Sequence, residues 1–155
     1  MGRKADAAKR RELDKRMEAF RAKCREVGLR VTPQRTVVYQ ALVETNEHPS
    51  AETVFRQVRQ VFPCISLDTV NRTLMTLNDM GAAFIVPGSG DAKRFDANLE
   101  SHQHFRCVTC KRIFDLYDEP HDEVPVPKNL PAEFTVLRSM VYIEGVCDLC
   151  QEAQD

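Results

Sequence analysis

Residues 66–96 read SLDTVNRTLMTLNDMGAAFIVPGSGDAKRFD and decide the fold class of the chain. Ser66 is a favoured helix N-cap and Gly81 is a favoured residue just beyond a helix, so together they delimit a predicted helix. Two short strands, AAFIV and KRFD, are predicted at residues 82–86 and 93–96, and the connection PGSGD between them is rich in turn-forming residues. A helix followed by a short β-hairpin is typical of a winged helix-turn-helix.

Three further helices are predicted before this segment. The first is a charged helix from residue 5 to about residue 27 with one apolar stripe. The second follows Thr32, an N-cap residue, has proline at its first position and covers residues 33–45. Ser50 caps a third helix, which ends at Pro63. The first part of the chain is therefore predicted to be helical.

The chain changes character after residue 96. Short strands are predicted at residues 104–108, 112–117 and 134–146. The segment between the last two strands, residues 119–133, contains four prolines, which make a long helix improbable. The predicted fold class is α+β, an N-terminal winged helix-turn-helix domain plus a small C-terminal α/β domain.

The predicted domains differ in charge. We place the winged-helix domain at residues 1–92, with a basic helical extension over residues 1–26, and the second domain at residues 93–155. Residues 1–95 contain 17 Lys and Arg against 11 Asp and Glu, whereas residues 96–155 contain 5 against 12. This asymmetry favours a half that faces a polyanion and a half that faces cations, although random surface variation is the alternative.

Composition restricts the class of protein further. With 43% hydrophobic and 29% charged residues, the chain can form a normal core. No apolar run approaches the ~20 residues of a membrane span, and the charged N-terminus lacks the apolar core of a secretory signal. We therefore expect a cytoplasmic protein, in which paired CxxC motifs indicate metal binding. Cys24 and Cys64 stand outside such pairs and are predicted to be packing residues.

Two CxxC pairs form the strongest motif. Cys107 and Cys110 are separated from Cys147 and Cys150 by 36 residues. Each pair can place two thiolates on one ion, and two pairs complete the tetrahedral shell of a structural zinc. The alternatives are a redox dithiol or two unrelated buried pairs, but thioredoxin-like motifs open a helix after a strand, whereas both pairs here flank strands.

Histidines and aspartates form a second constellation. Alternation along a strand puts His102 and His104 on one face, able to hold one ion. Asp96 and Asp115 lie nearby in the sequence, and His48 lies at the end of the second predicted helix. Imidazole and carboxylate suit iron(II), manganese(II) or zinc(II) better than copper(I). From spacing alone, a surface HxH pair and a helix-ending histidine remain alternatives.

These motifs together resemble the ferric-uptake-regulator (Fur) family over about residues 25–150. The order and the spacing of the matching stretches also agree with the family. The stretches are GLRVTPQR (28–35), EHPSAETVF (47–55), SLDTVNRTLMTLNDMG (66–81), RFD (94–96), HQHFRCVTCKRIFD (102–115) and GVCDLC (145–150).

The resemblance implies a cytoplasmic homodimer that binds double-stranded, palindromic, AT-rich operator DNA through its N-terminal domains and dimerises through its C-terminal domains. It also implies a structural Zn²⁺ and a regulatory ion, Fe²⁺ or Mn²⁺, with Zn²⁺ possible in vitro. The structural zinc carries over onto Cys107, Cys110, Cys147 and Cys150. The regulatory ion carries over onto His48, Asp96, His102, His104 and Asp115.

The carboxylates indicate a branch of the family. Asp96 and Asp115 are both aspartates, as in the peroxide-sensing repressors, whereas the iron-uptake repressors resemble this layout with glutamates. An additional site of many iron-uptake repressors would fall on Ser101, Gln103 and residues 137–140, which contain no histidine. The resemblance is therefore closest to the peroxide-sensing branch.

The function implied is a metal-dependent transcriptional repressor that senses hydrogen peroxide by iron-catalysed oxidation of a ligand histidine, His48 or His104. The alternatives are an iron- or zinc-responsive uptake regulator of the same family and a zinc-dependent interaction module that does not bind DNA. An enzyme is disfavoured because no nucleophile or general base accompanies the ligands, which are spread over a predicted hinge.

We expect DNA contacts from the predicted fourth helix and from basic residues around it. Asparagine replaces the tyrosine that is usual in the family at position 71, so the operator should differ from the usual sequence. A solvated helix face is the alternative for the arginines, and the basic extension is either a DNA-contacting or a solubilising helix. The expected contacts are Arg30, Arg35, Ser66, Thr69, Asn71, Arg72, Thr73 and Lys93.

Overall fold

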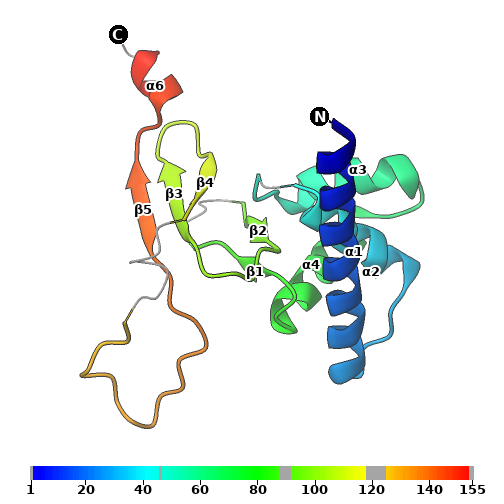
Figure 1. Cartoon of the computed structure of the whole chain (residues 1–155), viewed down its shortest axis with the longest axis horizontal. Helices are drawn as coiled ribbons and strands as arrows, with labels where there is room; N and C mark the ends of the chain where they lie inside the picture. The colour runs from blue at the N-terminus through cyan, green and yellow to red at the C-terminus, as the bar shows by residue number, and fades with distance from the viewer. Residues whose placement is uncertain (1, 46, 88–91, 118–124, 154–155) are drawn as a thin grey trace. The chain divides into compact units, whose positions relative to one another are not determined.

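The computed structural model describes residues 2–45, 47–87, 92–117 and 125–153, with side chains from residue 7 (Figure 1). The chain forms two compact units, residues 1–99 and 100–155. Within the described residues, no helix combines the length and the apolar character that a membrane span requires.

Helices dominate the first unit. They are α1 (Gly2–Glu26), α2 (Pro33–Val43), α3 (Ala51–Val61) and α4 (Leu67–Asp79), as the sequence predicts. Thr32, Ser50 and Ser66 each accept a hydrogen bond from the amide three residues later, at 3.2, 3.3 and 3.1 Å. Each cap satisfies an amide that the helix itself leaves unpaired. Gly81 adopts a φ of +72° just after α4, a conformation that favours glycine.

One hydrophobic core holds the four helices together. The Phe20 ring of α1 stacks on Tyr39 of α2 with centroids 4.5 Å apart. Cys24 is fully buried in this core, which confirms its packing role. The same prediction for Cys64 is wrong, because Cys64 is exposed while the neighbouring Ile65 is buried.

A short hairpin completes the first unit. Strand β1 (Phe84–Ile85) pairs antiparallel with β2 (Phe95–Asp96). The strands are shorter than predicted because the amides of Ala82 and Ala83 both donate to the Leu77 carbonyl and so close the end of α4. The centre of the predicted turn, residues 88–91, lies outside the described residues. Pairing of β2 with β1 keeps residues 95–96 in the first unit, so the units divide seven residues after the predicted domain boundary.

In its described residues, 100–117 and 125–153, the second unit contains a three-stranded sheet and one short helix. Strand β3 (Gln103–Cys107) lies between β4 (Ile113–Leu116), which is antiparallel to it, and β5 (Tyr142–Gly145), which is parallel. Helix α6 (Asp148–Glu152), which the sequence did not predict, follows β5. The strand predicted over residues 134–146 is too long, because β3 pairs only with residues 142–145 and residues 134–139 are exposed.

Candidate metal centres and nucleic-acid interface

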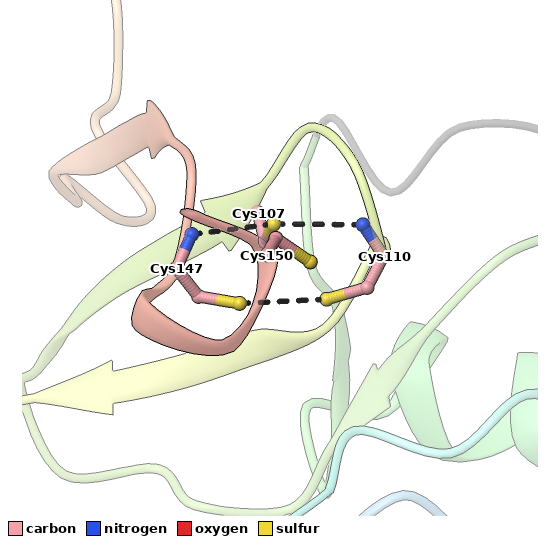
Figure 2. A group of neighbouring side chains, drawn as sticks. All are labelled: Cys107, Cys110, Cys147 and Cys150. Carbon is pink, nitrogen blue, oxygen red and sulfur yellow. Dashed lines mark hydrogen bonds between the residues drawn. The ribbon is translucent and has the colours of Figure 1, made fainter. Parts of the chain in front are cut away.

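Four cysteine side chains converge in the second unit (Figure 2). Cys107 ends β3, Cys110 follows in the turn, Cys147 is the N-cap of α6, and Cys150 lies within α6. Their sulfur atoms all lie within 4.8 Å of one another, and those of Cys110 and Cys147 are 3.8 Å apart. Zinc–sulfur distances of ~2.3 Å imply sulfur–sulfur separations of about 3.8 Å in a tetrahedron. All four are free thiols, so the group fits a four-thiolate zinc.

Backbone amides donate hydrogen bonds to one of these sulfurs, that of Cys107. The amides of Cys147 and Cys110 donate to Cys107 Sγ at 3.4 and 3.5 Å. These hydrogen bonds, the Cys147 amide first, lower the pKa of Cys107 to about 5. In the turn between β3 and β4, Lys111 has a φ of +63°, which is unusual for a residue with a side chain. The amide hydrogen bonds therefore favour the thiolate form of Cys107, which is the form that binds zinc.

The other cysteines have different surroundings. The Arg112 guanidinium donates to Cys110 Sγ through Nε at 3.5 Å and lowers the pKa of that thiol. It also donates to Cys147 Sγ through Nη2 at 3.8 Å. Burial, by contrast, raises the pKa of Cys150 to about 12. Sequence reasoning missed Arg112, because arginine is not a metal ligand and only its contacts reveal the role.

The second unit also gathers two imidazoles and a carboxylate. His104 of β3 pairs in register with Asp115 of β4, and His102 lies two residues before it. The Nε2 atoms of His102 and His104 are 3.0 Å apart, and Asp115 Oδ1 lies 3.5 and 3.6 Å from them. Both imidazoles are buried. These separations resemble those of neighbouring ligands on one ion, which are ~3 Å for metal–ligand distances of ~2.1 Å.

A backbone carbonyl selects the tautomer of the neutral His102 ring. His102 Nδ1 lies 2.8 Å from the Glu100 carbonyl oxygen. Because a carbonyl can only accept, Nδ1 donates to it, and in the neutral ring Nε2 then presents its lone pair towards His104 and Asp115. Such a hydrogen bond commonly orients a metal-binding histidine.

The first unit contributes a histidine–aspartate pair of its own. His48 Nε2 lies 3.4 Å from Asp96 Oδ2, and both side chains are buried. Asp96 is fixed by the Asn98 amide, which donates to its Oδ1 at 2.7 Å. Of the five predicted regulatory ligands, the structure thus brings two together in this unit and three together in the second.

The backbone at His48 is held by the hairpin. His48 has a φ of +48°, which is rare for a residue other than glycine. Arg94 Nη1 donates to the His48 carbonyl at 3.2 Å, and the Phe95 amide donates to the Pro49 carbonyl at 3.1 Å. Strained backbone of this kind persists where its surroundings determine it, and it is frequent at functional sites.

The predicted DNA-contacting residues of α4 divide into two groups. Asn71 and Arg72 are exposed, and Arg72 forms an ion pair with Asp68 at 3.0 Å. Ser66 and Thr69 form the helix cap, with their hydroxyl oxygens 2.9 Å apart. They lie at the end of the helix where amides can meet a phosphate.

Thr73 corrects the prediction. Its side chain is buried and its hydroxyl donates to the Thr69 carbonyl at 2.8 Å. It follows buried Val70 by three residues and precedes buried Leu77 by four, so it belongs to the core face of α4. The structure thus places Thr73 in the core and not among the exposed residues of α4.

The remaining predicted contacts lie outside α4. Arg30 is exposed, and its carbonyl accepts a hydrogen bond of 2.7 Å from Arg35 Nη1. Lys93 is exposed beside the hairpin, with Nζ 3.7 Å from Met75 Sδ. Arg30 and Lys93 are thus available to a polyanion, whereas Arg35 is half-buried.

Comparison with known proteins identifies the family. The sequence profile described as the ferric uptake regulator family matches residues 26–138. The chain belongs to the ferric uptake regulator family. This membership confirms the predicted α+β fold with a winged helix-turn-helix, and it makes the protein a transcriptional regulator, as the sequence predicts.

Relatives within the family extend over nearly the whole chain. The peroxide-responsive repressor PerR of Staphylococcus epidermidis is 30% identical over 94% of this chain and 97% of its own length. The ferric uptake regulator Fur of Helicobacter pylori, whose structure has three functional metal-binding sites, shares the fold with a TM-score of 0.70 at 22% identity, covering 92% and 96% of the two chains. PerR of Streptococcus pyogenes is 28% identical with a TM-score of 0.50, covering 87% and 92%.

Proposed function

We propose that this protein is a metal-dependent repressor that releases DNA in response to hydrogen peroxide. A structural zinc would be held by the four-cysteine group, and a regulatory iron(II) or manganese(II) by the histidines and aspartates. The observation that carries the proposal is the group of two imidazole nitrogens and one carboxylate oxygen, 3.0–3.6 Å apart, in the second unit. The proposed regulatory ligands are His48, Asp96, His102, His104 and Asp115.

The donor set suits a redox-active ion. Two histidines and one carboxylate on one face are the ligands of many non-haem iron(II) sites. Iron(II) bound there would supply the one-electron chemistry that activates peroxide. His102, His104 and Asp115 would hold the ion, and the Glu100 carbonyl would keep the His102 lone pair directed at it.

The relatives support the peroxide response. Curated proteins that are 29–30% identical over at least 90% of this chain are peroxide-responsive repressors. Both carboxylates here are aspartates, as in that branch. We propose that peroxide oxidises His48 or His104, which are both buried, so that the oxidant reacts where it forms. An oxidised imidazole is a weaker donor, and the ion would then be lost.

Release of DNA follows if one ion takes ligands from both units. We propose that His48 and Asp96 of the first unit complete the site begun by the second. The bound ion would then stabilise the arrangement that binds DNA, because its affinity for that arrangement is higher. Loss of the ion removes this stabilisation.

The partners we propose are a second copy of the chain and an AT-rich, palindromic duplex. Dimerisation through residues 93–155 would cover apolar side chains that the second unit exposes, such as Phe134 and Leu137, which are 64% and 93% exposed. Residues 1–92 would bind the duplex, with Asn71 and Arg72 as base readers. A repressor acts where the DNA is, so we place the protein in the cytoplasm. Further proposed contacts are Arg30, Arg35, Ser66, Thr69 and Lys93.

DNA retention tests the proposal. A random duplex pool is selected with manganese-loaded protein, and the selected DNA is then bound by protein loaded with iron(II), manganese(II) or zinc(II), each with and without peroxide. We expect peroxide to abolish binding in the iron form alone, with one oxygen atom added to the peptide of His48 or His104. His102→Ala should abolish metal-dependent binding and keep the zinc.

The same experiment distinguishes the second candidate, an iron- or zinc-responsive uptake regulator. Imidazole and carboxylate ligands do not by themselves choose among divalent ions, so this candidate shares the site. It predicts DNA binding that follows metal concentration and is unchanged by peroxide in the iron form. An iron form without an oxidised histidine after peroxide treatment contradicts the peroxide-sensing proposal.

A further inference from the structure

The four cysteine sulfurs differ in the hydrogen bonds that they accept. Cys107 Sγ accepts two backbone amides, and Arg112 donates to Cys110 and Cys147. In the described part of the chain, no N–H group donates to Cys150 Sγ. An N–H donor stabilises thiolate charge and so reduces the basicity and nucleophilicity of the sulfur. When zinc holds all four sulfurs as thiolates, Cys150 therefore keeps the most nucleophilic sulfur of the group.

Arg112 is held against the sulfurs by its surroundings. Its guanidinium carbon lies 5.5 Å from the centre of the Phe114 ring, two residues along the chain. The planar fork of the guanidinium reaches two sulfurs at once, from Nε and from Nη2. A zinc ion with four thiolates carries a net charge of about −2, so a fixed cation stabilises the loaded site. The neighbouring Lys111 does not share this role, because its Nζ donates to the Val108 carbonyl.

We propose that Arg112 protects the four-cysteine zinc site from peroxide and that oxidation of the site, when it occurs, starts at Cys150. This inference rests on the proposed function, since it requires zinc on the four cysteines. A peroxide sensor that reports through its histidines needs a zinc site that reacts more slowly than they do. The hydrogen bonds from the Arg112 guanidinium slow the reaction of the Cys110 and Cys147 sulfurs with peroxide, and those from backbone amides slow the reaction of Cys107.

The oxidation consumes one peroxide molecule for each pair of thiolates. The Cys150 thiolate attacks one peroxide oxygen, the O–O bond breaks, and a sulfenic acid forms while hydroxide leaves. The Cys147 thiolate, three residues away, then attacks the sulfenic sulfur, and a disulfide forms as a second hydroxide leaves. Two thiolates are oxidised, one peroxide is reduced to two hydroxides, and the zinc loses two of its four ligands.

Zinc release measures the protection by Arg112. Full-length protein that carries zinc alone is treated with peroxide, and released zinc is followed with a chromogenic chelator. We expect Arg112→Gln to release zinc about tenfold faster than the wild type, because a hydrogen bond to a charged group is lost. Arg112→Lys should lie between them, since a lysine keeps the charge without the fork. The matched control is Arg106→Gln, which removes an arginine of the same unit that pairs with Glu144.

Mapping of the first oxidised sulfur in the wild type gives a second test that needs no variant. A dione reagent that captures sulfenic acids is added early in the reaction, and peptides are identified by mass spectrometry. Capture at Cys150, followed by a Cys147–Cys150 disulfide, supports the inference. First capture at Cys107 or Cys110 overturns it, as does wild-type zinc release from Arg112→Gln. Purified protein without one zinc per chain would instead refute the proposed zinc site, so the two failures are distinguishable.

Discussion

The two units of the chain have different interiors. The first unit buries a continuous apolar core from all four helices and the hairpin. Among the described residues of the second unit, the buried side chains are those of Cys107, Ile113 and Cys147 together with His102, Gln103 and His104. Most of that interior therefore consists of candidate metal ligands. The first unit is stabilised by the hydrophobic effect, whereas the second unit has a small apolar core, so we expect its folding to depend on the proposed zinc.

Loss of one zinc ligand should separate the two units most strongly, because only the second unit should lose its structure. Cys107→Ser removes a fully buried ligand, and structural zinc contributes on the order of 10 kcal/mol to small domains. We expect the variant to lose zinc and hydrogen-exchange protection at residues 103–107, while the helices of the first unit persist by circular dichroism. Cys64→Ser, which changes an exposed thiol, is the control. A protected sheet without zinc would show that the second unit does not need the metal.

A cavity in the first unit should destabilise that unit and leave the zinc content of the second unchanged. Phe20→Ala removes a ring that is 1% exposed and stacked on Tyr39, so unfolding of the first unit should become easier by about 3–5 kcal/mol. Denaturant unfolding followed by helical circular dichroism measures this change. Zinc content should stay at the wild-type value, and Val61→Ala, at a 73% exposed position, should change stability by less than about 0.5 kcal/mol. Zinc loss in Phe20→Ala would mean that the units are not independent.

The end of α4 offers a smaller test. Gly81 has a φ of +72° and open space where a Cβ would lie, so Gly81→Ala adds strain without a clash. We expect a loss of about 1–2 kcal/mol in the first unit, because an alanine disfavours this conformation. Gly28→Ala, at a φ of +68°, should behave in the same way and serves as the replicate. Wild-type thermal stability in both variants would contradict the assignment of strain.

The turn between β3 and β4 allows the reverse change, a residue with a side chain replaced by glycine, and we expect the smallest effect there. Lys111 has a φ of +63°, a conformation that glycine adopts without strain. Lys111→Gly should therefore stabilise the loaded second unit by less than about 1 kcal/mol, partly offset by loss of the hydrogen bond to the Val108 carbonyl. Competition with a zinc chelator measures the gain as slower zinc loss. Faster zinc loss would show that the Lys111 side chain matters more than its backbone.

Local signals made most of the first unit predictable. The caps at Thr32, Ser50 and Ser66 and the glycine at position 81 marked the helix ends because each solves a local hydrogen-bonding or backbone problem. The burial of Thr73 was missed because polarity alone suggested an exposed contact, whereas helical phase decides which face is buried.

The second unit was less predictable because its structure depends on pairing between distant segments. The extent of β5 is set by the length of β3, and no local pattern in residues 134–146 carries that information. The CxxC spacing did indicate the four-cysteine group, since ligand geometry is encoded locally. The hydrogen bonds from Arg112 and from the Glu100 carbonyl required coordinates, because neither residue type is a metal ligand.

The hydrogen bonds between the His48 segment and β2 couple that histidine to the hairpin. Arg94 and Phe95 donate to the carbonyls of His48 and Pro49, and Asp96, the next residue, faces the imidazole itself. A displacement of the His48 imidazole would therefore be transmitted to the β1–β2 hairpin through these backbone hydrogen bonds, without passing through a helix. Under the proposed function, oxidation of the His48 ring would therefore act directly on the segment that forms β2.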